Sequence, residues 1–467
     1  MGSAEERVAR LEAQIERLLE TVSALQAENA RLRARVAELE SKLGMNSTNS
    51  HKPPSSDPPG TRSGKSGSGR SRGGQKGHKG HRRERLTPSK VTEVDAKQCA
   101  CCGSKNLSRT ADEPRWHQNA DLPQSIQVDV HEWRRFASEC ADCSSVTWAP
   151  LPDSVPLQLI GPRLGAFIAV LLASRMSRRD IQTLLADVFG FPVALGTLSG
   201  EEQRISERLA PAADEAADYA RAQDVKNVDA STWKQAGKLM SLWTIATSLV
   251  SVFFVRPDGT APTVQALLGS LRGILVTDRG SQFGFWAMAQ RQICWAHLLR
   301  KFVSFSERDG PAGALGRDLV LCTQVLFVEW HAFRDGKQSR AQMATRLRVL
   351  ETAIIAHLHQ GVRLGIRGVS GSCKDVLQHS DALFTFVHVE GVEPTNNHAE
   401  RMLRALVIWR KTSYGSQSER GSLFTARLMT AAQTLRQQGR SLYEFMVDIA
   451  LAGTRGRKYP SLLPVNP

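Results

Sequence analysis

The chain lacks a long apolar run. Its longest such stretch, Leu164–Ala173, has ten residues out of 467, whereas a transmembrane helix needs about 20. The first residues are charged rather than apolar, so we expect no secretory signal peptide. These two absences argue against the membrane and secreted classes and favour a cytoplasmic protein that has no membrane partner.

Acidic residues are scarce relative to basic ones. The 46 Asp and Glu residues stand against 61 Lys and Arg, which gives a net charge of +15. Such an excess favours a polyanionic partner, either a nucleic acid or an anionic surface. Cysteine is also sparse, and the eight residues include two C-x-x-C pairs. That pattern favours a metal site in a reducing compartment over a disulfide framework.

A heptad repeat occupies residues 5–43 and predicts a parallel dimeric coiled coil, and with it a homodimer or higher assembly. Leucine at the d positions with β-branched residues at most a positions favours two parallel strands, and a single Asn at a fixes their register. An amphipathic helix packed within one chain is the alternative. The a positions are Val8, Ile15, Val22, Asn29, Val36 and Leu43, and the d positions are Leu11, Leu18, Leu25, Leu32 and Leu39.

Residues 44–85 have the composition of a basic disordered linker. Pro, Gly and Ser dominate, apolar residues are nearly absent, and ten Lys or Arg residues face two acids. Such a segment cannot build a core. Its concentrated charge predicts contact with DNA phosphates, although a tail kept soluble by its charge is the plainer interpretation. The candidate DNA-binding residues here are Lys76, Lys79, Arg82 and Arg83.

Two cysteine pairs within residues 86–150 predict a small zinc-binding module. Cys99 with Cys102, and Cys140 with Cys143, match a closed tetrahedral Zn²⁺ site of structural type. The 37 residues between the pairs exceed the usual gap of roughly 15–20, so a longer hairpin must fill it, and Ile126–Trp133 has the pattern of a strand. Cys101 is a competing ligand, and unligated or redox-active cysteine is the alternative.

Residues 161–222 have a helical pattern. Two short amphipathic helices, Arg178–Val188 and Ala194–Leu209, flank the turn FGFPV. Their spacing fits a helix-turn-helix and so predicts a DNA-binding region. A plain helical connector fits the same pattern.

In residues 223–415 the spacing of the apolar residues changes from a helical pattern to one in which strands and helices follow each other. This pattern predicts an α/β core. The strands Asn227–Ser231, Lys238–Thr247 and Leu249–Val255 precede a helix, Pro262–Leu271, and the strand Gly273–Thr277. Asp229 lies on the first strand, and Asp278 directly follows the fourth. A further helix at Gln282–Ala289 and a short strand ending at Cys294 come next. Residues 302–390 read as a helical insertion, and residues 416–467 as a C-terminal helical tail.

One helix, Glu393–Gly415, carries the third acid. Four polar residues share one face of it by helical spacing, namely Asn397, Glu400, Arg401 and Arg404. A carboxylate flanked by an amide and two guanidinium groups suits a metal and a phosphate backbone. A solvated helix face is the alternative. We therefore expect Asp229, Asp278 and Glu400 to converge on a divalent cation.

The order of these acids resembles that of a ribonuclease-H-like DDE core. More narrowly, the chain resembles the transposase of the insertion-sequence sixty-six family over nearly its full length. The resemblance rests on MNSTNSHKPPSSD and GGQKGHKGH in the linker, on the paired cysteines, and on LVTDRG, ICWAHLLRKF, EPTNNHAERMLR and RKTSYGS. The family usually carries a second acid after the first catalytic Asp, where this chain has Ala230.

This resemblance implies a bacterial, nucleoid-associated DNA transposase with Asp229, Asp278 and Glu400 as its catalytic triad. It also implies small accessory proteins from the same element. Two Mg²⁺ (or Mn²⁺) ions would support in-line cleavage of double-stranded DNA at the element ends and joining of the 3′-hydroxyl to target DNA. His297, Arg300 and Lys301 would contact the scissile phosphate, as Asn397, Arg401 and Arg404 would from the third helix.

Two other functions fit parts of the same sequence. A non-catalytic dimeric DNA-binding regulator explains the first 210 residues and leaves the acids structural. A metal-dependent nuclease without strand transfer also fits the acids, and only joining of a 3′-end to target DNA separates it from a transposase. For His297 the alternative is an ordinary helix histidine.

Overall fold

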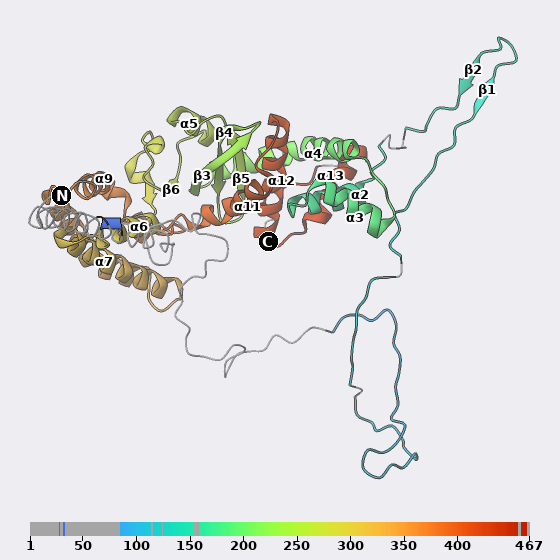
Figure 1. Cartoon of the computed structure of the whole chain (residues 1–467), viewed down its shortest axis with the longest axis horizontal. Helices are drawn as coiled ribbons and strands as arrows, with labels where there is room; N and C mark the ends of the chain where they lie inside the picture. Colours follow the sequence, from blue (N-terminus) through green and yellow to red (C-terminus); the bar gives the residue numbers. More distant parts are fainter. Residues whose placement is uncertain are drawn as a thin grey trace, which may run out of the picture. The chain divides into compact units, whose positions relative to one another are not determined.

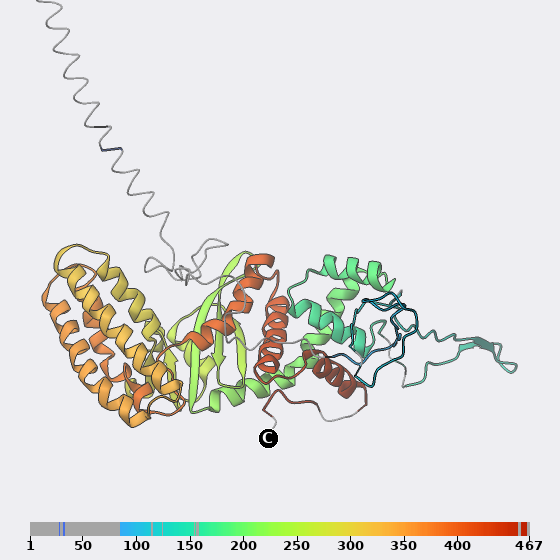
Figure 2. The same cartoon turned by 90° about the horizontal axis from the view of Figure 1, so that it is seen from below.

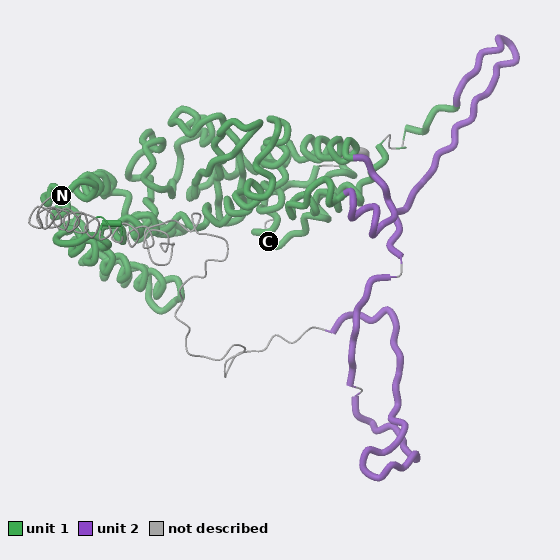
Figure 3. The backbone as a smooth tube through the Cα atoms, in the orientation of Figure 1, with its two compact units in different colours: residues 1–64, 149–181, 195–467 green, residues 65–148, 182–194 purple. Residues whose placement is uncertain are grey.

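The structure, a computed structural model, describes residues 85–455 and 459–464 apart from 114, 124, 154, 156 and 157, together with residues 28, 31 and 32. The predicted coiled coil and basic linker, including Lys76, Lys79, Arg82 and Arg83, therefore lie almost wholly outside the described residues. The chain divides into two compact units (Figure 3). Of the described residues from 85 onward, unit 1 holds 149–181 and those from 195 on, and unit 2 holds those up to 148 together with 182–194.

Unit 2 contains the paired cysteines. A two-stranded antiparallel hairpin, β1 (Ala137–Glu139) and β2 (Val146–Trp148), pairs Ser138 with Thr147. Ile126–Trp133, which the sequence predicts to be a strand, has no regular secondary structure. That prediction is wrong because the alternating segment finds no partner strand, and an isolated alternating run has no ladder to join.

Unit 1 is built on one five-stranded mixed sheet in the order β5-β4-β3-β6-β7 (Figures 1 and 2). The first three strands are antiparallel neighbours, and β6 and β7 add in parallel beyond β3. The strands are β3 (Val225–Gln235), β4 (Lys238–Ala246), β5 (Ser251–Arg256), β6 (Ile274–Thr277) and β7 (Arg291–Ile293).

The helices of unit 1 pack on this sheet or on one another. They are α2 (Pro162–Ala173), α4 (Leu195–Ala222), α5 (Ala261–Leu268), α6 (Trp295–Ser306), α7 (Gly310–Arg334), α8 (Arg340–Arg363), α9 (Ser370–Gln378), α10 (Thr385–His388), α11 (Asn397–Ser413), α12 (Glu419–Gln437) and α13 (Leu442–Arg455). A further helix, α3 (Arg178–Phe189), runs from unit 1 into unit 2. The chain is thus of mixed α/β class.

One hydrophobic cluster fixes the third acid-bearing helix on the sheet. Leu403 and Leu406 of α11 pack with Trp233 of β3 and Phe253 of β5, and Met429 of α12 completes the cluster. All five side chains are almost fully buried. Burying side chains of this size stabilises the packing by about 1.5–3 kcal/mol each, so α11 is held firmly against β3.

The helices from α7 to α10 form a second core at one end of the sheet (Figure 2). Leu319 and Leu326 of α7 are buried there with Phe302 of α6 and Leu358 of α8. By length and composition alone, α7 is apolar enough to cross a membrane. It packs against α6 and α8 and buries Leu319 and Leu326 there, whereas Leu321, Val325 and Val328 are exposed.

Two local predictions differ from the structure. The predicted helix Gln282–Ala289 is instead two short 3₁₀ turns, Ser281–Phe283 and Met288–Gln290, because Phe283 and Trp286 turn inward to be buried. The predicted helix Ala194–Leu209 extends to Ala222 as α4, whose later turns bury Ala216 and Ala220. α4 packs on α12 and β5.

The chain leaving α11 is locked to the β3–β4 hairpin through a glycine. Gly415 has φ +100°, and a Cβ there would lie 2.1 Å from the Lys234 carbonyl oxygen. The next residue, Ser416, donates to that oxygen at 2.9 Å and accepts from the Ala236 N–H at 2.8 Å. Only glycine allows this approach.

We predict that Gly415→Ala destabilises the protein by about 2–5 kcal/mol, because backbone strain and a steric clash add. Gly439→Ala is the matched control, since Gly439 also has positive φ (+66°) but open space around its Cβ position. The control should cost about 1–2 kcal/mol. Thermal unfolding followed by circular dichroism measures both, and equal losses would contradict the role of the close approach.

Candidate active site

Strand register brings the first two acids to the same level of the sheet. β3 and β6 are parallel neighbours, and Asn227 pairs with Val276. Asp229 and Asp278 each lie two residues beyond that pair, on neighbouring strands about 4.8 Å apart. Asp229 lies within β3, and Asp278 directly follows the carboxyl end of β6. Asp278 is held by a hydrogen bond from the Gly280 N–H to its Oδ1 at 2.9 Å.

Glu400 reaches the same region from the first turn of α11. All three acids are half-buried, and they are electrostatically coupled. Burial raises the pKa of Asp229 to about 7, against the hydrogen bond from the Ala230 N–H, and the charges of Glu400 and Asp278 add to the rise. A rise of this kind is expected for a carboxyl group that is shielded from water and lies near other carboxylates.

A buried amide ties these elements together. Asn396, 1% exposed, donates from Nδ2 to the Val228 carbonyl at 2.7 Å and accepts from Asn227 Nδ2 at 3.1 Å. Its backbone N–H donates to Cys294 Sγ at 3.1 Å, and its carbonyl accepts from the Glu400 N–H at 3.2 Å. Asn396 therefore joins the strand of Asp229, the start of α6 and the helix of Glu400.

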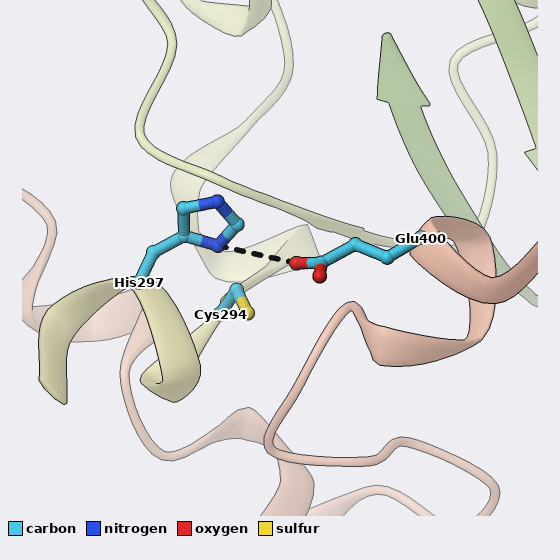
Figure 4. Close-up of side chains that lie close together, drawn as sticks. All are labelled: Cys294, His297 and Glu400. Carbon is cyan, nitrogen blue, oxygen red and sulfur yellow. Dashed lines mark ion pairs between the residues drawn. The ribbon is translucent and has the colours of Figure 1, made fainter. Parts of the chain in front are cut away.

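Figure 4 shows that the side chains of Cys294 and His297 lie close to that of Glu400. Within the described ranges, Cys294, His297 and Glu400 have ligand atoms within 4.8 Å of one another. His297 Nδ1 lies 3.7 Å from Glu400 Oε1, and both atoms are buried without a hydrogen-bond partner. Asp229 and Asp278 are not members of this group.

The donor chemistry decides which residues suit a cation. Cys294 is fully buried at the N-cap of α6, and burial raises the pKa of its thiol to about 11. That thiol accepts a hydrogen bond from the Asn396 N–H, and a soft sulfur is not the kind of ligand that Mg²⁺ prefers. The unpaired Oε1 of Glu400, with two neighbouring aspartates, is an oxygen donor set of the kind that Mg²⁺ or Mn²⁺ takes.

The basic residues predicted from the sequence fall into two groups. His297, Arg300 and Lys301 line an open pocket of about 640 Å³ together with Asp278. Arg300 Nη2 lies 3.9 Å from Glu400 Oε1. On α11, by contrast, the side chains of Asn397, Arg401 and Arg404 are exposed.

The pKa of His297 is lowered, mainly by burial and also by Arg300. Its imidazole is therefore neutral at pH 7 and can accept or donate one hydrogen bond beside Glu400.

The cysteine pairs form two similar turns in unit 2. The Cys99 N–H donates to the Ser104 carbonyl at 2.8 Å, and the Cys140 N–H donates to the Ser145 carbonyl at 2.9 Å. Hydrogen bonds from the Cys102 and Cys101 N–H groups lower the pKa of Cys99, and bonds from Ser145 lower that of Cys143. In the part of the chain that the structure describes, the four sulfurs do not form one cluster of ligand distance.

Sequence reasoning missed Asn396, Arg279 and Arg308, the last two of which line the same pocket. An available signal for Asn396 was its place at the N-cap of α11, where Asn is favoured. Its side chain bonds β3 instead of capping the helix.

Comparisons with known proteins identify the class. The sequence model of the IS66 family of transposases matches residues 158–423, and the chain belongs to this family. A second model, of a family of unknown function (DUF6444), matches residues 3–84. An uncharacterised protein, y4hP of Sinorhizobium fredii (strain NBRC 101917 / NGR234), is 23% identical over 376 residues, which cover 72% of this chain and 67% of that protein.

We predict that Asn396→Ala destabilises unit 1 by about 2–4 kcal/mol, because it removes two hydrogen bonds and leaves the buried Val228 carbonyl unpaired. The exposed neighbour provides the control, since Asn397→Ala should change stability by less than about 0.5 kcal/mol. Thermal unfolding compares the two. Equal effects would show that the buried amide does not hold the site together.

A second prediction concerns Asp229 and pH. Its folded pKa of about 7 lies above the ordinary 3.8, so the folded state binds the extra proton between these values. Stability from this group is present below about pH 4 and is lost as pH rises to 7. A shift of this size corresponds to at most about 4 kcal/mol.

Asp229→Asn should therefore raise the melting temperature of the metal-free protein most at pH 8, less at pH 5 and little below pH 4. Added Mg²⁺ should stabilise the wild type at pH 8 more than the variant, since a bound ligand stabilises the state that binds it. Asp224→Asn, an exposed acid just before β3, is the charge-matched control. A destabilised Asp229→Asn at pH 8 would contradict the electrostatic account.

Proposed function

We propose that the protein is a DDE transposase that cuts insertion-element ends and joins the freed 3′-hydroxyl to target DNA. The observation that carries this proposal is the electrostatic coupling of Asp229, within β3, to Asp278, directly after β6, and to Glu400, in the first turn of α11. The sheet order, three antiparallel strands followed by two parallel ones, supports a ribonuclease-H-like core. Membership of the IS66 family supports the role in transposition.

The chemistry needs an activated oxygen and a stabilised leaving oxygen. Two divalent cations, Mg²⁺ or Mn²⁺, supply both in an in-line displacement when about 3.5–4 Å apart. Asp229, Asp278 and Glu400 would hold these cations through their carboxylate oxygens. His297, held neutral, would orient the free Oε1 of Glu400, as hydrogen-bonding neighbours do for ligating carboxylates. Arg300 and Lys301 would hold the scissile phosphate.

The other regions would bring DNA to this centre. In this proposal residues 5–43 pair two chains, the basic linker contacts phosphates, and Cys99, Cys102, Cys140 and Cys143 hold a structural Zn²⁺. The turn hydrogen bonds shared by the two cysteine pairs support that site. The segment from α3 to the start of α4 serves as the helix-turn-helix, and Asn397, Arg401 and Arg404 add phosphate contacts from α11. The protein would work in the bacterial cytoplasm at the nucleoid with accessory proteins of its element.

The test is cleavage and joining of labelled element-end DNA with Mg²⁺. Asp229→Asn, Asp278→Asn and Glu400→Gln should each reduce cleavage by more than about 100-fold, whereas Asp224→Asn should retain it. Joined product from the wild type distinguishes a transposase from a nuclease that stops at cleavage. Full cleavage by any of the three variants would overturn the triad.

Wild-type binding without cleavage, even with the element's other proteins added, would favour a non-catalytic DNA-binding regulator. The DNA affinity of the same protein preparations would then be measured without a cleavage assay.

A further inference from the structure

The pocket beside Asp278 carries more positive charge than the proposed triad needs. Four cations line it, Arg279, Arg300, Lys301 and Arg308, against two acids, Asp278 and Asp375. Burial lowers the pKa of Lys301, and the charges of Arg279 and Arg308 lower it further. The cations thus repel one another, and an anion bound in the pocket would relieve this repulsion.

The shape of α6 explains why the cations are aligned. His297, Arg300, Lys301 and Ser304 recur every three or four residues and share one face of the helix. Arg308 follows just beyond the helix end. Eleven residues at 1.5 Å each span about 16 Å, so the pocket wall extends from the acids toward the helical insertion.

The lining chemistry suits phosphate better than a base. No Phe, Tyr or Trp lines the pocket, so a nucleotide base would lack the rings on which bases usually stack. Guanidinium groups and a serine hydroxyl are donors that fit phosphate oxygens. Away from Asp278, the four positive charges disfavour a divalent cation in the rest of the pocket.

The insertion contributes a carboxylate to this pocket. Arg279 forms an ion pair with Asp375 of α9, 96 residues away in the sequence. The side chain of Arg279 is 17% exposed and that of Asp375 is 45% exposed. Asp375 also lies 3.7 Å from His379 Nδ1. The insertion fixes Arg308 too, whose Nη1 donates to the Arg367 carbonyl at 2.9 Å.

We propose that this pocket binds a backbone phosphate of the DNA strand next to Asp278, and that Asp375 occupies the place of this phosphate in the DNA-free protein. Arg279 exchanges the carboxylate for the phosphate when DNA enters. The half-exposed carboxylate can leave for water at low cost, whereas the more buried guanidinium stays in the pocket. The proposal rests on the proposed function only in that the ligand is DNA.

The experiment measures binding of a labelled DNA duplex to the full chain by fluorescence anisotropy, without added Mg²⁺, over a range of salt concentrations. Arg279→Gln and Arg308→Gln should each weaken binding about 3–10-fold and reduce the slope of log Kd against log salt by about 1. Asp375→Asn should tighten binding about threefold or more. Most of that gain should disappear when Arg279→Gln is added, because the carboxylate acts through Arg279.

Two controls match these charge changes outside the pocket. Arg346→Gln removes an exposed arginine paired with Glu329, and Asp335→Asn removes a surface acid paired with Arg334. Each should change Kd by less than twofold. Melting temperatures establish that every variant is folded.

If a folded Asp375→Asn variant binds DNA as the wild type does, or more weakly, then Asp375 does not occupy the place of the phosphate. The ion pair between Arg279 and Asp375 would then have only a structural role. Wild-type Kd and salt slope in both arginine variants would overturn the phosphate site. This experiment measures no cleavage, so it tests the pocket separately from the triad. Weakened DNA binding by the arginine variants would support the pocket even if the triad variants cut DNA normally. Unchanged binding by the arginine variants would overturn the pocket even if the triad variants lost cleavage.

Discussion

The electrostatic coupling of three acids that are far apart in the sequence depends on how the start of α11 is fixed against β3. The buried side chain of Asn396 makes this connection by bonding the Val228 carbonyl, next to Asp229, where pairing with β6 has ended. Its backbone bonds Cys294 and Glu400. Leu403 and Leu406 then anchor the rest of α11 on the sheet. A shift of α11 along β3 would break the amide bonds first, so the position of Glu400 depends on them.

The site that this connection creates is electrostatically costly. Asp229 shares a poorly hydrated region with Glu400 and Asp278, and its pKa of about 7 expresses that cost. His297 stays neutral, and Arg300 is 3.9 Å from Glu400, too far for a close ion pair. The protein thus leaves its acids incompletely neutralised by its own side chains. Such local instability is expected where a site is built for a ligand rather than for the stability of the fold.

Much of the core could be predicted because its signals are local. Asp278 directly follows a buried apolar strand, and Glu400 lies in the first turn of an amphipathic helix, so pattern alone indicates both. The roles of Asn396 and Asp375 could not be predicted in this way. Each depends on a partner more than 90 residues away, Val228 or Arg279, and a single sequence carries no signal for such contacts.

The insertion is joined to the core firmly enough to act on the pocket. Gln292, on the edge strand β7, donates to the Leu383 carbonyl at 3.0 Å and accepts from the Phe386 N–H at 2.8 Å. Trp295 donates to the same Leu383 carbonyl at 2.7 Å. These buried bonds cover the exposed edge of the sheet, which would otherwise present unpaired groups. Since β7 lies beside β6, and Asp278 directly follows β6, the same contacts hold the insertion at the edge of the sheet nearest to that acid. The insertion therefore shapes the approach to the acids through the rigid edge of the sheet.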